Sequence, residues 1–450
     1  MEIHLTEPKS KSTFGGSTVP GISPHRLRAV SRDAIYRTAP NMRIVNSPVL
    51  YRSFFLLLLI LFSAVQNGTT QSFTKENLVK DIDDYKNKII KNHAHPFNYI
   101  RKEQFLDSVN LLKSKAPAMN LDELQVAFTR LNSLLLDPHT SIGFPKENFF
   151  PVSIYLFDDG IYLLASSIKY SKHLGSRILA INDIPVDTVL SVLKCLIGTN
   201  NQSWIKQSLS GLLTDPGTLC GMHIIPTKDS VPITLVNEKD TSRLVVYSEN
   251  QYSFELQSFQ PEQLMLRAGS RQNYWYQYIA EKKSLYIQYR SCFEIPERPF
   301  AKFQENVLEE LHSSKPERVI IDVRSNSGGS IKVFLPLIKV LARDSVCKSA
   351  KVSVLTGRRT FSAAIWNTFE MKNQLNATLI GEETGGDLNH PGAVVSFTLK
   401  HSKIKVYYSN YDFYLDATVK GGILPDIYIR HYWEDYKKGF DADLEKAFTY

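Results

Sequence analysis

Two stretches early in the chain repeat apolar residues every three to four positions. They cover residues 103–113 and 121–131, where the apolar side chains are separated by Gln, Asp, Asn or Lys. This period places the apolar side chains on one face of a helix. We therefore predict an N-terminal helical subdomain over residues 74–148.

The pattern changes to short alternating runs over residues 149–250. Val152-Ser-Ile-Tyr-Leu and Gly160-Ile-Tyr-Leu-Leu-Ala are typical of half-buried strands. The later string Gly175-Ser-Arg-Ile-Leu-Ala-Ile-Asn-Asp resembles the strand and turn of a PDZ-type domain. That resemblance implies a PDZ-like β module that binds peptide termini by strand addition. The same pattern would also suit another small β-rich module.

Strand and helix patterns alternate through residues 251–450. Apolar strands at 285–289, 319–322 and 351–355 are separated by helical patterns at 303–311 and 333–342. Such alternation predicts an α/β domain with helices packed on a sheet. The fold class expected for the whole chain is therefore α/β with a β module and a helical subdomain.

An apolar run over residues 53–64 is too short for an ordinary membrane span, which needs about 20 residues. Arg43 and Arg52 precede it, and the small residues at its end are followed by Val65 and Gln66. These features predict a signal peptide over residues 42–65, cleaved before Val65 or Gln66. The alternative is an uncleaved signal anchor, in which residues 53–64 hold the protein at a membrane. Both place the rest of the chain outside the cytoplasm, in the periplasm or the extracellular space.

Residues 1–41 are polar and unpatterned, so we expect them to be disordered. Met42 stands where a signal peptide would begin. We therefore expect that residues 1–41 derive from a wrongly chosen start codon.

The charge argues against a nucleic-acid partner. The 450 residues carry a net charge of +8, but eight Lys or Arg and only three Asp or Glu lie within residues 1–52, so five of those charges belong to that segment. The remainder is nearly balanced. The four cysteines show no metal-ligand spacing. We expect neither a metal nor a cofactor, and the sequence does not indicate the oligomeric state.

Two glycines follow the predicted strand at 319–323, in Arg324-Ser-Asn-Ser-Gly-Gly-Ser330. Without a Cβ atom, Gly328 and Gly329 leave backbone N–H groups open to a ligand. These groups could bind an oxyanion or a phosphate, although the phosphate-binding glycine motifs are missing. A purely structural turn is the other interpretation.

Ser362 lies at the predicted start of a helix, in Thr360-Phe-Ser-Ala-Ala. The small residues that follow leave its hydroxyl accessible, and a helix N-terminus stabilises negative charge. Ser362 is therefore a candidate nucleophile. The alternative is an ordinary helix cap.

His139 follows an apolar helix pattern that ends at Pro138. A loop histidine is a candidate general base because its pKa lies near neutrality. His93 and His95 form a competing pair, but no further metal ligands accompany them. We interpret that pair as structural or exposed.

Four motifs together resemble the tail-specific, C-terminal-processing serine protease family. They are Asp322-Val-Arg-Ser-Asn-Ser-Gly-Gly329, Thr360-Phe-Ser-Ala-Ala364, Gly381-Glu-Glu-Thr-Gly-Gly386 and Gly422-Ile-Leu-Pro-Asp426. Their order and spacing are more specific than any one motif. The resemblance implies a crotonase-like protease core over residues 251–450 that acts on peptides or proteins.

The family has two catalytic arrangements, and this chain resembles the tricorn-like one. In the lysine type, a lysine is the general base, and Glu383 stands at its position in this chain. A carboxylate cannot replace that amine. In the tricorn-like type, a histidine in an early loop is the base, and His139 matches it. The resemblance implies that Ser362 forms an acyl-enzyme with His139 as general base. It also implies an oxyanion hole, formed by the backbone N–H groups of Gly328 or Gly329 and of Ala363.

The chain departs from the tricorn-like pattern at two positions. Val419 stands where relatives carry an orienting glutamate, and Pro138 stands where some carry a serine. Asp416 is the nearest replacement for the acid that we can name, with Asp412 a weaker one.

Two other enzyme classes lack their required motifs, and a third alternative, which is not an enzyme, remains. Ser345-Val-Cys-Lys348 fits the Ser-x-x-Lys of β-lactamases, but their Lys-Thr-Gly is missing. Ser362 also lacks the Gly-x-Ser-x-Gly elbow of α/β-hydrolases. The third is an inactive relative that binds a peptide or an apolar ligand, because fold does not establish chemistry.

Overall fold

The computed structural model describes residues 74–143, 148–238, 240–250 and 252–450. The predicted signal segment and the residues before it lie outside these ranges. Within them, no helix is long and apolar enough to cross a membrane.

A six-stranded sheet forms the centre of the C-terminal region, in the order β11-β12-β13-β14-β15-β18. Its strands are β11 (Tyr274–Ile279), β12 (Ser284–Tyr289), β13 (Arg318–Asp322), β14 (Lys351–Thr356), β15 (Thr378–Gly381) and β18 (Ile427–Tyr428). β11 is antiparallel to β12, and all other neighbours are parallel. The region is the mixed α/β fold that the sequence predicts.

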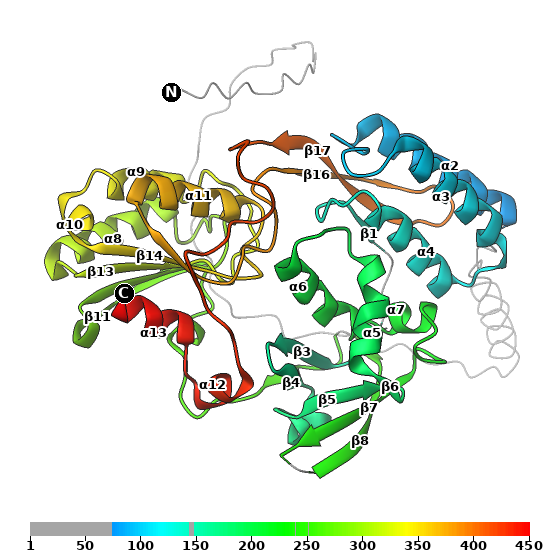
Figure 1. The fold of residues 1–450 in the computed structure, drawn as a ribbon, viewed down its shortest axis with the longest axis horizontal. Coiled ribbons are helices and arrows are strands. Elements are labelled where there is room, and N and C mark those ends of the chain that lie inside the picture. The colour runs from blue at the N-terminus through cyan, green and yellow to red at the C-terminus, as the bar shows by residue number, and fades with distance from the viewer. Residues whose placement is uncertain (1–73, 144–147, 239, 251) are drawn as a thin grey trace, which may run out of the picture. The chain divides into compact units, whose positions relative to one another are not determined.

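Helices cover both faces of this sheet (Figure 1). They are α8 (Phe300–Ser314), α9 (Leu335–Leu341), α10 (Ser345–Ser349) and α11 (Ala363–Leu375) on one face, and α13 (Ala442–Thr449), which follows α12 (Trp433–Lys438), on the other. Val319 and Ile321 pack toward the first group, whereas Ile320 packs with Leu444 and Phe448 of α13. Covering both faces explains why β13 is apolar at consecutive positions.

The β module has an antiparallel sheet in the order β10-β4-β5-β7-β8, with β3 on the other side of β4. Its main elements are β3 (Val152–Phe157), β4 (Gly160–Ser166), β5 (Arg177–Ile181), β7 (Ser230–Asn237), β8 (Asp240–Tyr247), β10 (Gln257–Ser258), α5 (Val186–Leu193), α6 (Gln202–Leu212) and α7 (Pro216–Gly221). Short β6 (Ile184–Pro185) extends it. The pair β2 (Asn148–Phe149) and β9 (Glu249–Asn250) joins the two ends of the module.

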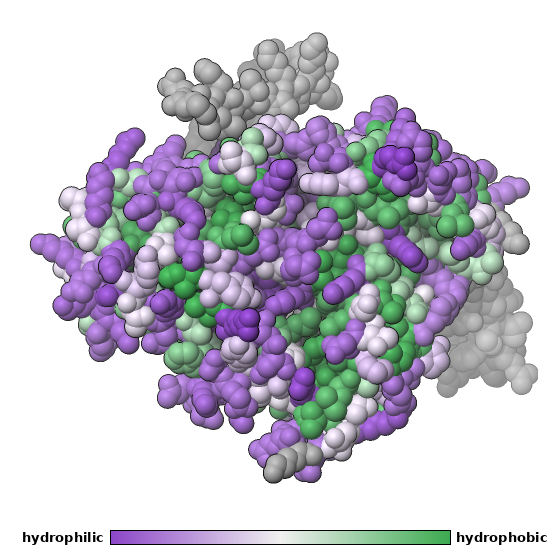
Figure 2. Space-filling model, viewed as in Figure 1, coloured by the Kyte–Doolittle hydropathy of each residue, from purple (hydrophilic) through white to green (hydrophobic). Residues whose placement is uncertain are grey.

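Apolar side chains reach the surface of this module. Figure 2 shows them gathered over its strands and helices, and Leu179, Val192, Val245 and Tyr247 are among those exposed. The PDZ-like interpretation of the module stays a prediction.

The N-terminal helices pack on a hairpin that belongs to the C-terminal region. The helices are α2 (Lys75–Asn92), α3 (Lys102–Lys115) and α4 (Leu121–Ser133), and the hairpin is β16 (His390–Thr398) with β17 (Lys405–Phe413). Leu399, Ile404 and Val406 share one apolar core with the helices. The short β1 (Ser141–Gly143), just after His139, pairs with β17. This pairing holds the His139 loop against the C-terminal region.

Candidate active site

Ser362 lies in the turn between β14 and α11, directly before the first helical residue. Its backbone has φ 54° and ψ −125°, a region that non-glycine residues rarely adopt. The preceding residue, Phe361, anchors the turn because its N–H donates to the carbonyl of Asn326 at 3.0 Å and its ring stacks on Trp204. The Ser362 side chain makes no capping hydrogen bond to the helix. The structure therefore does not support the helix-cap interpretation.

The glycine turn after β13 lies against Ser362. Gly328 has φ +103°, and a Cβ atom there would stand 2.8 Å from Ser362 Cβ. Only glycine permits this approach. The N–H of Gly328 donates to Asn326 Oδ1 at 2.9 Å, so it is already occupied. Among the described residues, the N–H groups of Gly329 and Ala363 have no hydrogen-bond partner, which leaves them free to receive an oxyanion.

His139 lies beside the residue that precedes Ser362. Its ring stacks on Phe361, with centroids 4.4 Å apart, and on the other side it stacks on His390 at 4.8 Å and 6° between planes. The side chain is only 7% exposed. Neither ring nitrogen has a hydrogen-bond partner within the described part of the chain. The structure thus places the predicted base, His139, against Phe361, the residue before the predicted nucleophile.

Asp137 is the carboxylate that faces His139, and the sequence assigned it no role. Its Oδ1 accepts the His139 backbone N–H at 2.9 Å and lies 3.7 Å from His139 Nδ1. Its Oδ2 accepts from Thr140 Oγ1 at 2.5 Å and from Ser409 Oγ at 2.7 Å. Burial alone would raise the pKa of Asp137, but the neighbouring His139 ring and hydrogen bonds from His93, Ser409 and Thr140 hold it well below its usual range. Asp137 is therefore a buried, ionised carboxylate.

His93 completes the shell around Asp137. The backbone N–H of His95 donates to His93 Nδ1 at 3.1 Å, so the proton of a neutral ring is assigned to Nε2. That Nε2–H donates to Asp137 Oδ2 at 3.1 Å. His93 is buried and has a structural role, whereas the His95 side chain is 62% exposed.

Two other acids considered from the sequence lie in separate surroundings. Asp416 accepts the N–H and the hydroxyl of Thr418, at 2.9 and 2.7 Å, and no hydrogen bond or ion pair of the described residues joins it to His139. Glu383 accepts from Asn201 Nδ2 at 3.1 Å and from the Gly422 N–H at 3.2 Å. Burial raises the pKa of Glu383. The structure therefore brings Asp137, rather than either of these acids, to His139.

A strained serine at a helix start, unpaired backbone N–H groups and a buried histidine with a carboxylate are the parts that a serine-hydrolase site requires. Residues 283–429, which contain both turns, match the model of Peptidase family S41. The match covers about a third of the chain and marks these residues as similar to an S41 peptidase domain, which supports a serine peptidase.

Solved structures of mature CPAF show the same fold. Mature CPAF complexed with lactacystin aligns with a TM-score of 0.63 at 14% identity, over 84% of this chain and 98% of that chain. Mature CPAF alone aligns with a TM-score of 0.62 at 13% identity, over 84% of this chain and 97% of that chain. The photosystem II D1 C-terminal processing protease aligns with a TM-score of 0.41 at 14% identity, over 82% of this chain and 96% of that chain. No curated protein matches the chain in sequence.

Proposed function

We propose that the chain is an exported serine endopeptidase that cleaves peptide bonds through an acyl-enzyme on Ser362, with His139 as general base. The observation that carries this proposal is the stack of the buried His139 imidazole on Phe361, the residue directly before the strained Ser362. The S41 match supplies the substrate class, peptides or proteins. The exported location rests on the predicted signal segment at residues 42–65.

In the first half-reaction His139 takes the proton of the Ser362 hydroxyl while Oγ attacks the peptide carbonyl carbon. The carbonyl oxygen becomes an oxyanion, which the N–H groups of Gly329 and Ala363 bind. Loss of one such donor typically costs about 3 kcal/mol of transition-state stabilisation. His139 then protonates the leaving amine. Water, deprotonated by the same ring, releases the acyl group and restores Ser362.

Asp137 would orient His139 and stabilise its protonated form. Oδ1 faces Nδ1, which leaves Nε2 as the nitrogen available to Ser362. The 3.7 Å separation is longer than a hydrogen bond, and such contacts often tighten only when substrate binds. The ionised state of Asp137 suits this role, because a carboxylate stabilises the imidazolium that forms.

Labelling with a fluorophosphonate serine-hydrolase probe tests the proposal. The wild type, begun at Gln66, should label, whereas Ser362→Ala and His139→Ala should not. Ser349→Ala and His312→Ala are matched controls, because both side chains are exposed and belong neither to the two turns nor to the His139 loop. A folded wild type that never labels would indicate instead a peptide-binding relative without activity. Lactacystin, present in the mature CPAF structure, offers a competitor for the same labelling.

Asp137→Asn should slow peptide hydrolysis by about 10²- to 10⁴-fold with little change in KM, because the amide cannot stabilise the imidazolium. Asp416→Asn is its control and should hydrolyse peptide at the wild-type rate. The reverse result would assign the orienting role to Asp416.

A further inference from the structure

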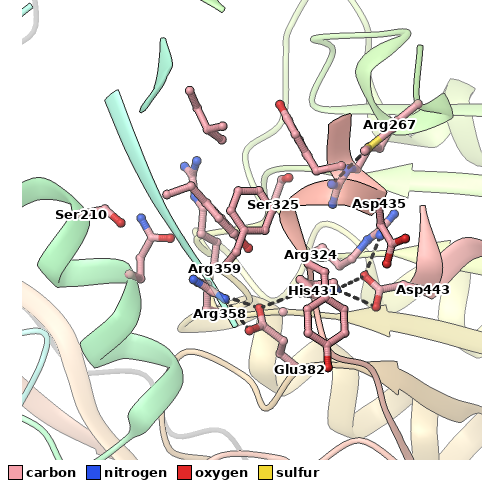
Figure 3. Close-up of a pocket in the computed structure, with 18 of the residues that line it drawn as sticks. Ser210, Arg267, Arg324, Ser325, Arg358, Arg359, Glu382, His431, Asp435 and Asp443 are labelled. Atoms are coloured by element: carbon pink, nitrogen blue, oxygen red, sulfur yellow. Dashed lines mark hydrogen bonds and ion pairs between the residues drawn. The ribbon is translucent and has the colours of Figure 1, made fainter. Parts of the chain in front are cut away.

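A cavity of about 520 Å³ is lined in part by two turns: the glycine turn that follows β13 and the serine turn between β14 and α11. Figure 3 shows charged side chains converging in it from the turns, from the strand ends and from the C-terminal segment. Arg324 and Ser325 line it from the glycine turn, and residues 357–359 line it from the serine turn. The residues that follow on each turn, Asn326 to Gly329 and Phe361 to Ser362, form the candidate active site. The cavity and the site are therefore the two sides of the same pair of turns.

Arg324 binds three carboxylates at one end of this cavity. It donates to Asp322 at 2.6 and 3.0 Å, to Asp441 at 2.5 and 2.9 Å, and to Asp443 at 2.8 Å. Burial would lower the pKa of Arg324, but the three carboxylates raise it further above its usual range. Asp441 and Asp443 stand at the start of α13, so the guanidinium joins the C-terminal helix to the end of β13.

His431 continues the same set of contacts toward the β module. Its Nε2 lies 2.9 Å from Asp443, and its Nδ1 lies 3.7 Å from Glu382. Glu382 receives two hydrogen bonds from Arg358, at 2.6 and 3.0 Å. Arg358 also donates to the carbonyl of Leu156 on β3, at 2.8 Å. Ion pairs and hydrogen bonds thus run without a gap from β3 to Arg324.

Asn326 connects this network to the two turns that carry the proposed oxyanion donors. Its backbone carbonyl receives the Phe361 N–H, and its Oδ1 receives the Gly328 N–H at 2.9 Å. Its Nδ2 donates to the carbonyl of Tyr289 at 3.0 Å. Because Asn326 lies two residues after Arg324, a shift of the Arg324 backbone would move the glycine turn relative to Ser362.

The charges of this network balance only when His431 is protonated. The four carboxylates are Asp322, Glu382, Asp441 and Asp443, and the cations are Arg324, Arg358, His431 and Arg267, whose Nε is 3.7 Å from Asp441. Asp158, on the β3–β4 turn, accepts the backbone N–H of His431 and is paired with Lys206 at 3.0 Å, so it is left out of this balance. Burial would lower the pKa of His431, but Asp443 and Glu382 raise it to about 9.

We propose that Arg324, Asp443 and His431 are positioning residues of the peptidase, which fix both catalytic turns to the C-terminal segment and to β3. This inference rests on the proposed function. All three line the cavity together with residues that precede the site on each turn, and no Ser362 or His139 atom lines it, so their loss should change the rate of the chemical step rather than the affinity. A misplacement of about 1 Å at a reacting group can cost about 10²-fold in rate.

Saturation kinetics of fluorophosphonate labelling separate the maximal rate from the affinity for the probe. Asp443→Asn should lower the maximal rate by about 10- to 100-fold and leave the affinity nearly unchanged. Asp443→Glu, which keeps the charge, should recover part of the rate. Asp183→Asn is the matched control, because it removes a two-bond Arg–Asp pair with Arg243 that lies exposed on the β module. It should label like the wild type.

A pH profile gives an independent readout. The maximal labelling rate of the wild type should fall as pH rises above about 9, when His431 loses its proton. His431→Gln should label slowly at neutral pH and should lack that alkaline decline.

The outcomes separate the two hypotheses. Absence of labelling in the wild type would overturn the proposed function, and the positioning role with it. A labelling wild type with an equally fast Asp443→Asn variant would overturn the positioning role alone. A rate loss accompanied by loss of near-UV circular dichroism, or not recovered at all by Asp443→Glu, would assign the network to stability and also overturn positioning.

Discussion

At the scale of residues, the candidate site combines strain with burial. Ser362 and Leu136, two residues before Pro138, both have positive φ, so each catalytic segment contains a backbone conformation that costs of order 1–3 kcal/mol. The contacts of Phe361 and of the Asp137 carboxylate hold these segments in place. The positions of Ser362 and His139 are therefore fixed by neighbouring residues outside the proposed chemistry.

His390 has a predictable effect on acid stability. Its Nδ1–H donates to the carbonyl of Asp387 at 2.8 Å, and burial, together with the neighbouring His139, lowers its pKa to about 4. As pH falls, the unfolded chain takes up this proton near pH 6.5 and the folded chain only near 4. Stability should therefore be lost between these values, by on the order of 3 kcal/mol.

The variant His390→Asn, whose amide can also donate to Asp387, removes this titration. Urea unfolding at pH 7 and at pH 4.5 should show a smaller acid loss than in the wild type. An identical loss in both proteins would show that His390 does not titrate in this range.

At the scale of elements, the parallel sheet decides where the turns meet. β13 and β14 are adjacent and parallel, with Asp322 paired to Leu355, so the segments that leave their carboxyl ends lie side by side. The glycine turn follows one strand and the serine turn follows the other. A ligand site at this edge is the usual result in open α/β sheets.

The face of the sheet beneath α13 should be sensitive to lost volume. Ile320 is fully buried against Leu444 and Phe448, so Ile320→Ala should lower the free energy of unfolding by about 2–5 kcal/mol. Leu179→Ala is the control, because Leu179 is 38% exposed on β5 and should change stability little. Urea denaturation measures both. Equal effects would show that α13 does not cover this face in solution.

At the scale of the whole molecule, the hairpin β16–β17 holds the N-terminal segments that carry the candidate base, His139. Asp81 on α2 accepts the backbone N–H groups of His401 and Ser402, at the turn of the hairpin. β1 then adds to β17, with Ser141 opposite Tyr407. The helices that precede His139 are thus held by the same hairpin that begins at His390.

Export predicts the start of the mature chain. Expressed in a secreting host, the protein should begin at Val65 or Gln66, because cleavage follows the small residues after the apolar run. Mass spectrometry of the N-terminal peptide measures this. Leu57→Asp should block export, since a charge interrupts the apolar run. Recovery of the uncleaved chain in the membrane fraction would identify a signal anchor instead.

The motifs could be found from the sequence because each is short and lies at a strand end. An apolar strand followed by Gly328 and Gly329, or by Ser362, has a local pattern that the α/β fold repeats. The same locality made the helical, β-rich and α/β stretches predictable. His139 was a candidate base from its loop position, but only the resemblance to a family favoured it over the other histidines.

The partners of these residues depended on contacts between distant parts of the chain. An aspartate such as Asp137 or Asp443 has the same local sequence signature in a solvated loop as in a buried ion pair. Whether it faces His139 or Arg324 is decided by how β1 adds to the hairpin and how α13 packs beneath the sheet. Burial then strengthens the attraction within these charge pairs, because water does not screen them in the low-dielectric interior.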